Sequence, residues 1–320
     1  MDISKIRNSF QLKFGLHFIS RTIVKEYCRK MSNYMNYSEA SKLYDEARVA
    51  ADAENIYNIF TGLLKKPANK IDLLDIGCGT GNYSYSFMKN GLQSITIADA
   101  SQEMLNCAKI KMKVFEDKVT AQDIILPNLP FPEKSFDVIS CMQVLHHIDS
   151  AALKESTKEH LQREDYPNML ETLGQAYNVL KPGGVLVIDV MFEENCESFW
   201  WTRLCPIAAK AFKRLRMSQK DMIQSLEKLN FENIVCTYFP GSRLVKKEIY
   251  DEIQCIDDPK WRYYLSQYKL VEKSGELDNL IKIVKDAETS GKLKEYFDDW
   301  SEKLWTHGNH SAVFAMKPLA

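Results

Sequence analysis

The nine residues Leu73-Leu-Asp-Ile-Gly-Cys-Gly-Thr-Gly81 decide the fold of this chain. They place Gly77, Gly79 and Gly81 directly after a short apolar run and ahead of a helical pattern. Glycine suits these positions because a loop that turns sharply, and lets its backbone approach a ligand, has no room for a Cβ atom. The amides at the start of the following helix then face the ligand with a favourable dipole. The stretch therefore predicts a strand, a ligand-binding loop and a helix in succession.

Strands and helices alternate along the chain from residue 71 onward. Short apolar runs that end at turn residues indicate strands, and the segments between them have helical patterns. Such alternation implies an α/β fold, with a parallel sheet covered by helices on both faces. The predicted strands are Ile71–Ile76, Ser94–Ala98, Phe136–Met142, Val185–Val190, Ile234–Phe239 and Ala312–Met316; the predicted helices are Ser101–Met112, Met169–Leu180, two within 36–65 (the first capped by Ser38), and further helical segments in 193–230 and 244–305.

Composition places the chain among ordinary folded proteins. Hydrophobic residues make up 45% and charged residues 27% of the 320 positions, and the formal net charge is −1. This charge gives no global field that would favour nucleic acid. The eight cysteines form no C-x-x-C pair, so we expect reduced cysteines and no metal site. Since no apolar stretch reaches about 18 residues, no transmembrane helix is expected.

The first 30 residues are basic. Their seven lysines and arginines face only two acidic residues, Asp2 and Glu26. Residues 1–35 are therefore interpreted either as a basic N-terminal arm or as a mitochondrial targeting segment. The period-two alternation from Phe10 to Phe18 favours a strand over a targeting helix. We expect a cytoplasmic protein, with a mitochondrial location as the alternative.

Further features fall in register with the glycine loop. Asp99 ends the second strand, 18 residues after Gly81, where a carboxylate can accept from both hydroxyls of a ribose. Met104 lies in a capped helix where it could flank an adenine, and Asp123 could accept from an exocyclic amine. Each feature alone has another interpretation: Asp99 could cap the following helix, and the glycines of Leu180-Lys-Pro-Gly-Gly184 could only stop a helix and form a turn. Together, in this order, they are hard to obtain by chance.

The set LDIGCGTG, IADAS-x-x-ML, LPFP-x-x-SFDVI, LHHI and LKPGG resembles the small-molecule branch (methyltransferase type 11/25-like) of class I S-adenosylmethionine-dependent methyltransferases. The resemblance implies a Rossmann-like, seven-stranded, mostly parallel sheet with helices on both faces, an N-terminal helical cap and C-terminal helical additions. On this basis residues 36–192 form the cofactor-binding core with its cap. Residues 193–320 form a C-terminal part with the last two strands and a helical substrate lid.

The resemblance also assigns the cofactor site. Asp75 and the loop backbone would hold the methionine part of S-adenosylmethionine, Asp99 the ribose, Asp123 and the Ile124 amide the adenine, and Gln143 would lie beside the sulfonium. Arg48 could pair with the cofactor carboxylate or be a surface charge. A dehydrogenase pattern is disfavoured because its third glycine is missing after Gly81. The implied cofactor-binding residues are Tyr44, Arg48, Asp75, Gly77, Cys78, Gly79, Gly81, Asp99, Ala100, Met104, Asp123, Ile124 and Gln143.

His146 and His147 are the catalytic candidates, because they follow the fourth strand where an acceptor should lie. Methyl transfer from a sulfonium is an in-line displacement of an activated group, so alignment supplies most of the rate, and a base is needed only if the acceptor loses a proton. The alternative is that one histidine, His146 in particular, is packed and satisfies a backbone carbonyl.

Three functions remain open at this stage. The chain is expected to methylate an oxygen, nitrogen, sulfur or activated carbon of a small molecule, and no nucleic-acid partner is expected. The alternatives are modification of a protein or tRNA, with Lys210–Arg216 as the densest basic stretch, and cofactor binding without catalysis. The sequence does not determine an oligomeric state.

All five tryptophans follow residue 199. One interpretation is that they pack added helices onto the domain. The other is an aromatic-lined lid over an aromatic or lipid-like acceptor, with an interfacial amphipathic helix starting at Phe199 that contacts a membrane surface.

Overall fold

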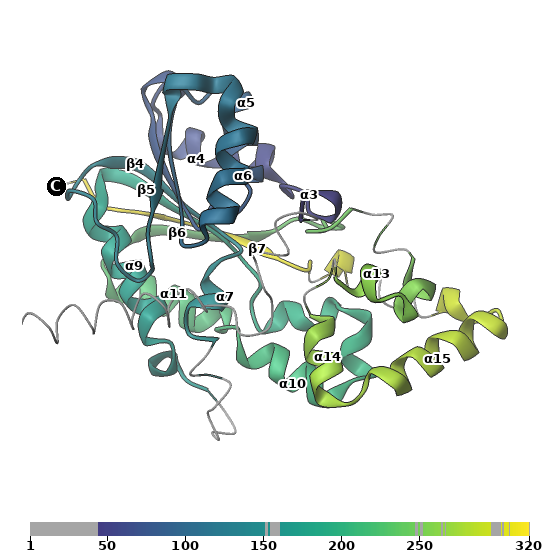
Figure 1. Cartoon of the computed structure of the whole chain (residues 1–320). Coiled ribbons are helices and arrows are strands. Elements are labelled where there is room, and N and C mark those ends of the chain that lie inside the picture. The colour runs from purple at the N-terminus through teal and green to yellow at the C-terminus, as the bar shows by residue number, and fades with distance from the viewer. Residues whose placement is uncertain are drawn as a thin grey trace, which may run out of the picture.

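A seven-stranded sheet forms the centre of the computed structural model (Figure 1), which describes residues 44–150, 161–246, 252–263, 267–295 and 308–319, together with 153, 249, 265, 302 and 304–306. The strand order is β3-β2-β1-β4-β5-β7-β6. All neighbours pair in parallel except β5–β7 and β7–β6, which are antiparallel. The predicted Rossmann-like, mostly parallel sheet is thus confirmed. The strands are β1 (Asp72–Ile76), β2 (Ser94–Asp99), β3 (Val119–Asp123), β4 (Phe136–Met142), β5 (Leu180–Val190), β6 (Glu232–Tyr238) and β7 (Ser311–Met316).

Helices cover both faces of this sheet, as predicted. Successive side chains of a strand point to opposite faces, and the two apolar clusters follow this alternation. Leu73 packs with Phe60 and Phe87 on one face, whereas its neighbour Leu74 packs with Leu173 on the other. The first face is covered by α4 (Ala53–Leu64), α5 (Asn82–Lys89) and α6 (Gln102–Met112), and the second by α7 (Leu145–Ile148), α9 (Pro167–Val179) and α11 (Gln219–Lys228).

Four further helices gather beyond the carboxyl ends of the strands (Figure 1). They are α10 (Pro206–Arg214), α13 (Pro259–Tyr263), α14 (Tyr268–Ser274) and α15 (Leu277–Thr289), and we refer to them as the C-terminal helices. Their apolar side chains continue the cluster on the second face of the sheet. The added helices therefore share a core with the sheet domain rather than forming a separate unit.

The tryptophans of this region hold the C-terminal helices together. Trp201 is fully buried, and its ring centroid lies 5.1 Å from that of Phe212 and 6.4 Å from that of Tyr268. Trp200 is also buried, while Ile207 is 62% exposed. The prediction of an interfacial helix starting at Phe199 is wrong, because the apolar face of this segment packs inside the protein and is not available to a membrane surface.

Several predicted boundaries differ from the structure. The LKPGG stretch was expected to be a helix stop and turn, but all of it belongs to β5. Gly184 is required there by close packing, since a Cβ would lie 2.8 Å from the Lys181 carbonyl oxygen and 3.0 Å from that of Asp137. Within residues 36–65, the described helices are the short α3 (Tyr44–Ala47) and α4.

Some predictions fall on residues outside the described ranges. These are the basic arm or targeting segment at 1–35 and the Ser38 cap. Among the described helices, none combines the length and apolar character needed to cross a membrane.

Candidate functional site

The glycine loop between β1 and α5 folds back onto the end of β2. The amides of Gly77 and Cys78 both donate to the Ala98 carbonyl, at 2.7 and 3.0 Å. Gly77 has a φ of +70°, and a Cβ on it would lie 2.1 Å from a methyl carbon of Val144. At Gly79, by contrast, a Cβ would meet no atom within 4 Å. Gly77 is thus required by packing, whereas Gly79 faces open space where a ligand could approach.

Asp75 lies beneath this loop and is fully buried. Its carboxylate accepts hydrogen bonds from the hydroxyls of Ser84 and Ser140, the latter at 2.7 Å. Burial raises the pKa of Asp75 to about 6, against the lowering effect of the two serines. Its oxygens are therefore occupied in fixing α5 and β4 to the loop, and its predicted role at the methionine part remains a prediction.

Asp99 joins the end of β2 to the glycine loop. One carboxylate oxygen accepts from the Gly79 amide and the other from the Ser101 amide, both at 2.8 Å. Burial raises the pKa of Asp99, partly offset by these amides. The two interpretations of Asp99 are compatible, because each oxygen that bonds the backbone keeps a lone pair for a ribose hydroxyl.

The residues predicted to surround adenine follow β2 and β3. Ala100 comes directly after Asp99, and Met104 is buried in α6, its amide capped by the Ser101 hydroxyl. Asp123 is exposed at the end of β3. The prediction for the Ile124 amide is not supported, because this amide donates to the Asp99 carbonyl at 3.2 Å and so extends the pairing of β2 with β3.

A small cavity of about 50 Å³ adjoins the glycine loop, and we call it the loop cavity. It contains several of the predicted cofactor residues, from both the loop and the N-terminal cap. Gly81, Asp99, Ala100, Met104, Asp123 and Ile124 lie outside its lining, so the cavity corresponds to the predicted methionine end. Its lining residues are Tyr44, Arg48, Val49, Asp75, Gly77, Cys78, Gly79, Thr80, Asn82, Tyr83, Met142, Gln143 and Leu244.

The short helix α3 is tied to the loop by a contact that sequence reasoning missed. The Asp45 carboxylate accepts from the Thr80 hydroxyl at 2.6 Å and pairs with the Lys111 ammonium at 2.7 Å. This places Tyr44 and Arg48, on either side of Asp45, at the loop cavity. That this segment caps the cofactor remains a prediction.

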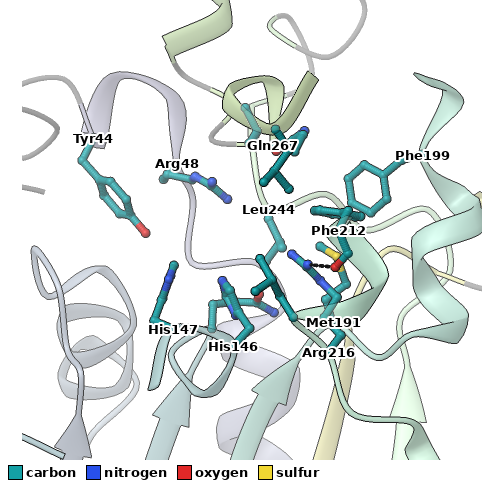
Figure 2. A pocket seen from close by; sticks show the side chains of 14 residues that line it. Tyr44, Arg48, His146, His147, Met191, Phe199, Phe212, Arg216, Leu244 and Gln267 are labelled. Atoms are coloured by element: carbon teal, nitrogen blue, oxygen red, sulfur yellow. Dashed lines mark hydrogen bonds between the residues drawn. The ribbon is translucent and has the colours of Figure 1, made fainter. Parts of the chain in front are cut away.

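A second cavity of about 40 Å³ lies between the carboxyl ends of β4 and β5 and the C-terminal helices (Figure 2). We call it the histidine cavity, because both His146 and His147 line it. It shares Tyr44, Arg48, Gln143 and Leu244 with the loop cavity. The other lining residues are Met191, Phe199, Phe212, Leu215, Arg216, Val245, Gln267 and Leu270. Among the described residues that line this cavity there is no tryptophan, and the aromatic-lined lid remains a prediction.

Gln143 stands at the boundary between the two cavities. Its φ is +58°, and its amide donates to the Asp189 carbonyl at 2.7 Å. The side-chain Nε2 is buried without a hydrogen-bond partner. Buried polar atoms normally have a partner, so this nitrogen is available to a ligand at the junction, where the sequence resemblance placed the sulfonium.

The two histidines occupy α7, directly after β4, and their ring centroids are 4.0 Å apart. Figure 2 shows His147 on the side of Tyr44 and His146 next to it, towards Met191. Burial, together with the positive potential of His147, Arg216 and Arg48, lowers the pKa of His146 well below its usual value. His146 is therefore neutral and a weak base at physiological pH.

A network of polar residues that the sequence did not reveal lies next to the loop cavity, with Asp189 and His310 buried and Tyr83, Asp52 and Ser242 half-buried. The two oxygens of Asp189 meet the Tyr83 hydroxyl at 2.7 Å and Nδ1 of His310 at 2.6 Å. Nε2 of His310 lies 3.0 Å from the Ser242 hydroxyl, which also bonds Asp52. Although burial opposes the charge, Asp189 and Asp52 raise the pKa of His310 to about 9. We call these five residues the buried ion network.

Comparison with known proteins finds a matching family and several relatives for the core of the chain. Residues 74–188 match a family described as a methyltransferase domain. A tRNA U34 carboxymethyltransferase of Nautilia profundicola is 24% identical over 198 residues, covering 61% of this chain and 58% of that protein. A ubiquinone biosynthesis O-methyltransferase of Pelagibacter ubique is 35% identical over 95 residues, covering 29% of this chain and 39% of that protein.

The fold extends further than the sequence similarity. A crystal structure from Anabaena variabilis, of a protein assigned to antibiotic biosynthesis, superposes with a TM-score of 0.62 at 16% identity and covers 84% of this chain and 98% of that one. The chain spans about half the length of the curated relatives it matches. Residues 74–188 therefore match a methyltransferase domain, and the similarity to the Anabaena variabilis structure shows a shared fold.

Proposed function

We propose that this chain transfers the methyl group of S-adenosylmethionine to an oxygen, nitrogen, sulfur or activated carbon of a small molecule. One observation carries the proposal: the loop cavity and the histidine cavity adjoin at Gln143. In-line displacement requires the nucleophile within about 3 Å of the methyl carbon and opposite the sulfur. Two cavities that share a wall would bring donor and acceptor into that relation once the lining side chains move apart, since each is too small for its ligand as it stands.

The residues around the loop cavity fit S-adenosylmethionine. Gly79 leaves open space for the methionine part, Asp99 has lone pairs for the ribose, and Gln143 offers an unpartnered donor at the junction. Arg48 provides a cation for the cofactor carboxylate. When bound, the cofactor supplies an already activated methyl group, so the task of the surrounding residues is to orient the acceptor and exclude water.

His147 is the better candidate for a base. It lines the histidine cavity on the side of Tyr44 (Figure 2), a residue that also lines the loop cavity. His146 is less suited because the depressed pKa of its imidazole makes it a poor proton acceptor. We assign His147 to orienting the acceptor, and to taking its proton where the acceptor is a hydroxyl, and His146 to packing against the His147 ring.

The histidine cavity favours an acceptor with an aromatic or apolar part. The rings of Phe199 and Phe212 lie edge to face, with centroids 5.4 Å apart, at one side of the cavity. The similarity to the ubiquinone biosynthesis O-methyltransferase is consistent with such an acceptor. The cavity of about 40 Å³ is little larger than one water molecule, so an acceptor can enter only when the surrounding side chains move.

A tRNA acceptor is the second candidate, because one relative is a tRNA enzyme. A wider hollow of about 610 Å³, the outer cleft, opens between α10 and the segment around Tyr166. Its charged lining residues are Arg203, Lys210, Lys213, Arg214 and Arg216 together with Glu193, Glu197 and Asp221. The three carboxylates offset part of the positive charge on which affinity for a phosphate backbone depends, and we favour the small molecule.

The test is turnover of methyl-labelled S-adenosylmethionine with three acceptor pools: a metabolite extract, bulk tRNA and total protein. Label in the small-molecule fraction supports the proposal, whereas label in tRNA or protein supports the second candidate. Cofactor binding without transfer in any pool would indicate a non-catalytic protein. With an acceptor found, His147→Ala should lower the transfer rate by ~10²-fold while cofactor affinity stays near wild type.

The cofactor assignment has its own test in Asp99→Asn. An asparagine side chain has one accepting oxygen and an NH₂ group that can only donate. The variant therefore loses the charge-assisted hydrogen bonds that the carboxylate accepts from the loop amide or would accept from the ribose. Affinity for S-adenosylhomocysteine, measured by calorimetry, should fall by at least ~1.5 kcal/mol, or more than tenfold. Asp117→Asn, at an exposed position, is the matched control. Equal affinities in the two variants would remove the ribose assignment.

A further inference from the structure

Two arginines reach the histidine cavity from different elements. Figure 2 shows Arg48 on the side of Tyr44, and Arg216 on the side of Phe212. The described lining of this cavity includes no aspartate or glutamate. Guanidinium groups are the side chains best suited to carboxylates and phosphates, because their planar forks match these groups with paired hydrogen bonds.

Contacts within its own segment orient Arg216. The residue is 5% exposed, and its guanidinium carbon lies 3.6 Å from the centre of the Phe212 ring. The guanidinium also donates to the Phe212 carbonyl. Stacking on the ring and this hydrogen bond hold the fork in one direction. An arginine fixed in this way loses little further conformational freedom when an anion arrives.

Other polar atoms in the cavity point to a ligand with acceptor oxygens. Nε2 of Gln143 and Nδ1 of His146 are buried without hydrogen-bond partners. Both residues line the same cavity as Arg216. The potential there is positive, since Arg48 and Arg216 both contribute to the lowered pKa of His146. Groups of this kind are normally satisfied, and here a bound oxyanion would satisfy them.

We infer that the histidine cavity takes an acceptor in which a carboxylate or phosphate stands next to an apolar body, and that Arg216 binds this oxyanion. The inference rests on the proposed function, since it assigns the substrate class of the same cavity. The two arginines have different roles in this inference. Arg48 lines both cavities and would pair with the cofactor carboxylate, whereas Arg216 lies outside the loop cavity, between the histidine cavity and the outer cleft, and would bind the acceptor.

The competing explanation is that Arg216 only caps the carboxyl end of α10, where a cation interacts favourably with the last carbonyls. In that role its removal would reduce stability without changing which ligands bind. A measurement of selectivity between charged and uncharged ligands therefore separates the two roles.

The experiment measures the dissociation constants of benzoate, phenyl phosphate and benzyl alcohol by titration calorimetry, with S-adenosylhomocysteine bound. These probes share one ring and differ in charge. At least one anion should bind ~10-fold or more tightly than the alcohol, as charge-assisted hydrogen bonds predict. In Arg216→Gln this advantage should disappear. Arg216→Lys keeps the charge without the fork and should retain part of it.

Lys210→Gln is the matched control, because it removes the same charge from an exposed position on α10 that lines the outer cleft. It should leave the preference unchanged. Preference for benzoate identifies a carboxylate acceptor, and preference for phenyl phosphate a phosphate acceptor. The inference is overturned if the three probes bind equally or not at all, if the preference survives in Arg216→Gln, or if it is lost in Lys210→Gln. Failure of the wild type to bind S-adenosylhomocysteine would instead contradict the proposed function.

Discussion

Replacing His310 by glutamine tests whether the buried ion network stabilises the fold through a charge. Burial opposes protonation of the imidazole, yet Asp189 and Asp52 raise its pKa from 6.5 to about 9, a difference of 2.5 (9 minus 6.5). Each pKa unit corresponds to about 1.4 kcal/mol, so the protonated imidazole stabilises the folded state by roughly 3 kcal/mol. The substitution removes this charge and leaves Asp189 with Tyr83 as its remaining side-chain partner.

The pH dependence of this contribution has a definite sign. Because the pKa of His310 is higher in the folded than in the unfolded protein, its contribution is complete below about pH 6.5 and is lost as the pH rises to about 9. The free energy of unfolding of the wild type should therefore fall by roughly 3 kcal/mol more between pH 6.5 and 9.5 than that of His310→Gln. At pH 6.5 the variant should be less stable by about 3–5 kcal/mol, the usual result of breaking a buried pair.

Urea unfolding followed by circular dichroism at the two pH values measures these differences, and the subtraction cancels every other group that titrates in the window. Asp189→Asn is the control, since without the carboxylate the imidazole loses its main reason to be charged. The wild-type pH dependence should be strongly reduced in that variant as well. Parallel pH profiles for the wild type and His310→Gln would show that the imidazole is neutral in the folded protein and would refute the reasoning.

Two pairs of substitutions test the packing around the site by urea unfolding. Gly77→Ala should cost at least ~2 kcal/mol more than Gly79→Ala, because only the first forces a Cβ onto the Val144 side chain. Val144→Ala should recover part of the difference, since it removes the methyl carbon at 2.1 Å but keeps the Val144 Cβ at 2.9 Å. Equal costs for the two glycines would contradict the packing argument. Trp201→Ala should destabilise the protein by about 3–5 kcal/mol, since its ring is fully buried, whereas Trp305→Ala, at 62% exposure, should stay within ~0.5 kcal/mol. A small effect at Trp201 would show that the ring is not part of the core.

The fold and the loop half of the site could be predicted from the sequence because their determinants are local. The glycine positions in residues 73–81 express backbone constraints of a single turn, and Asp99 follows its strand directly. The contacts that link distant segments could not be predicted. Asp45 and Thr80 are 35 positions apart, and Asp189 and His310 are 121 apart. An aspartate on a short helix, or a histidine before a strand, has no sequence pattern that names its partner.

The C-terminal helices show a second reason why the sequence could not predict the whole structure. Residue spacing indicated that the segment after Phe199 has an apolar face, and this was right, but spacing does not say what covers the face. The cover is Tyr268 of α14, about 70 positions later along the chain, whose ring lies near both Trp200 and Trp201. Arg216 was seen only as the end of a basic stretch, because its burial depends on the same distant packing.

The shared wall of the two cavities has a consequence for how ligands should be sought. Tyr44, Arg48, Gln143 and Leu244 border both cavities. If a ligand in one cavity shifts these side chains, it alters the affinity for the other ligand, and linkage requires that each changes the other's dissociation constant by the same factor. A compound screen on the empty protein would then rank ligands for a surface that differs from the one present during turnover. Screening with S-adenosylhomocysteine bound, and repeating each titration in the reverse order, would measure that coupling and find acceptors for the completed site.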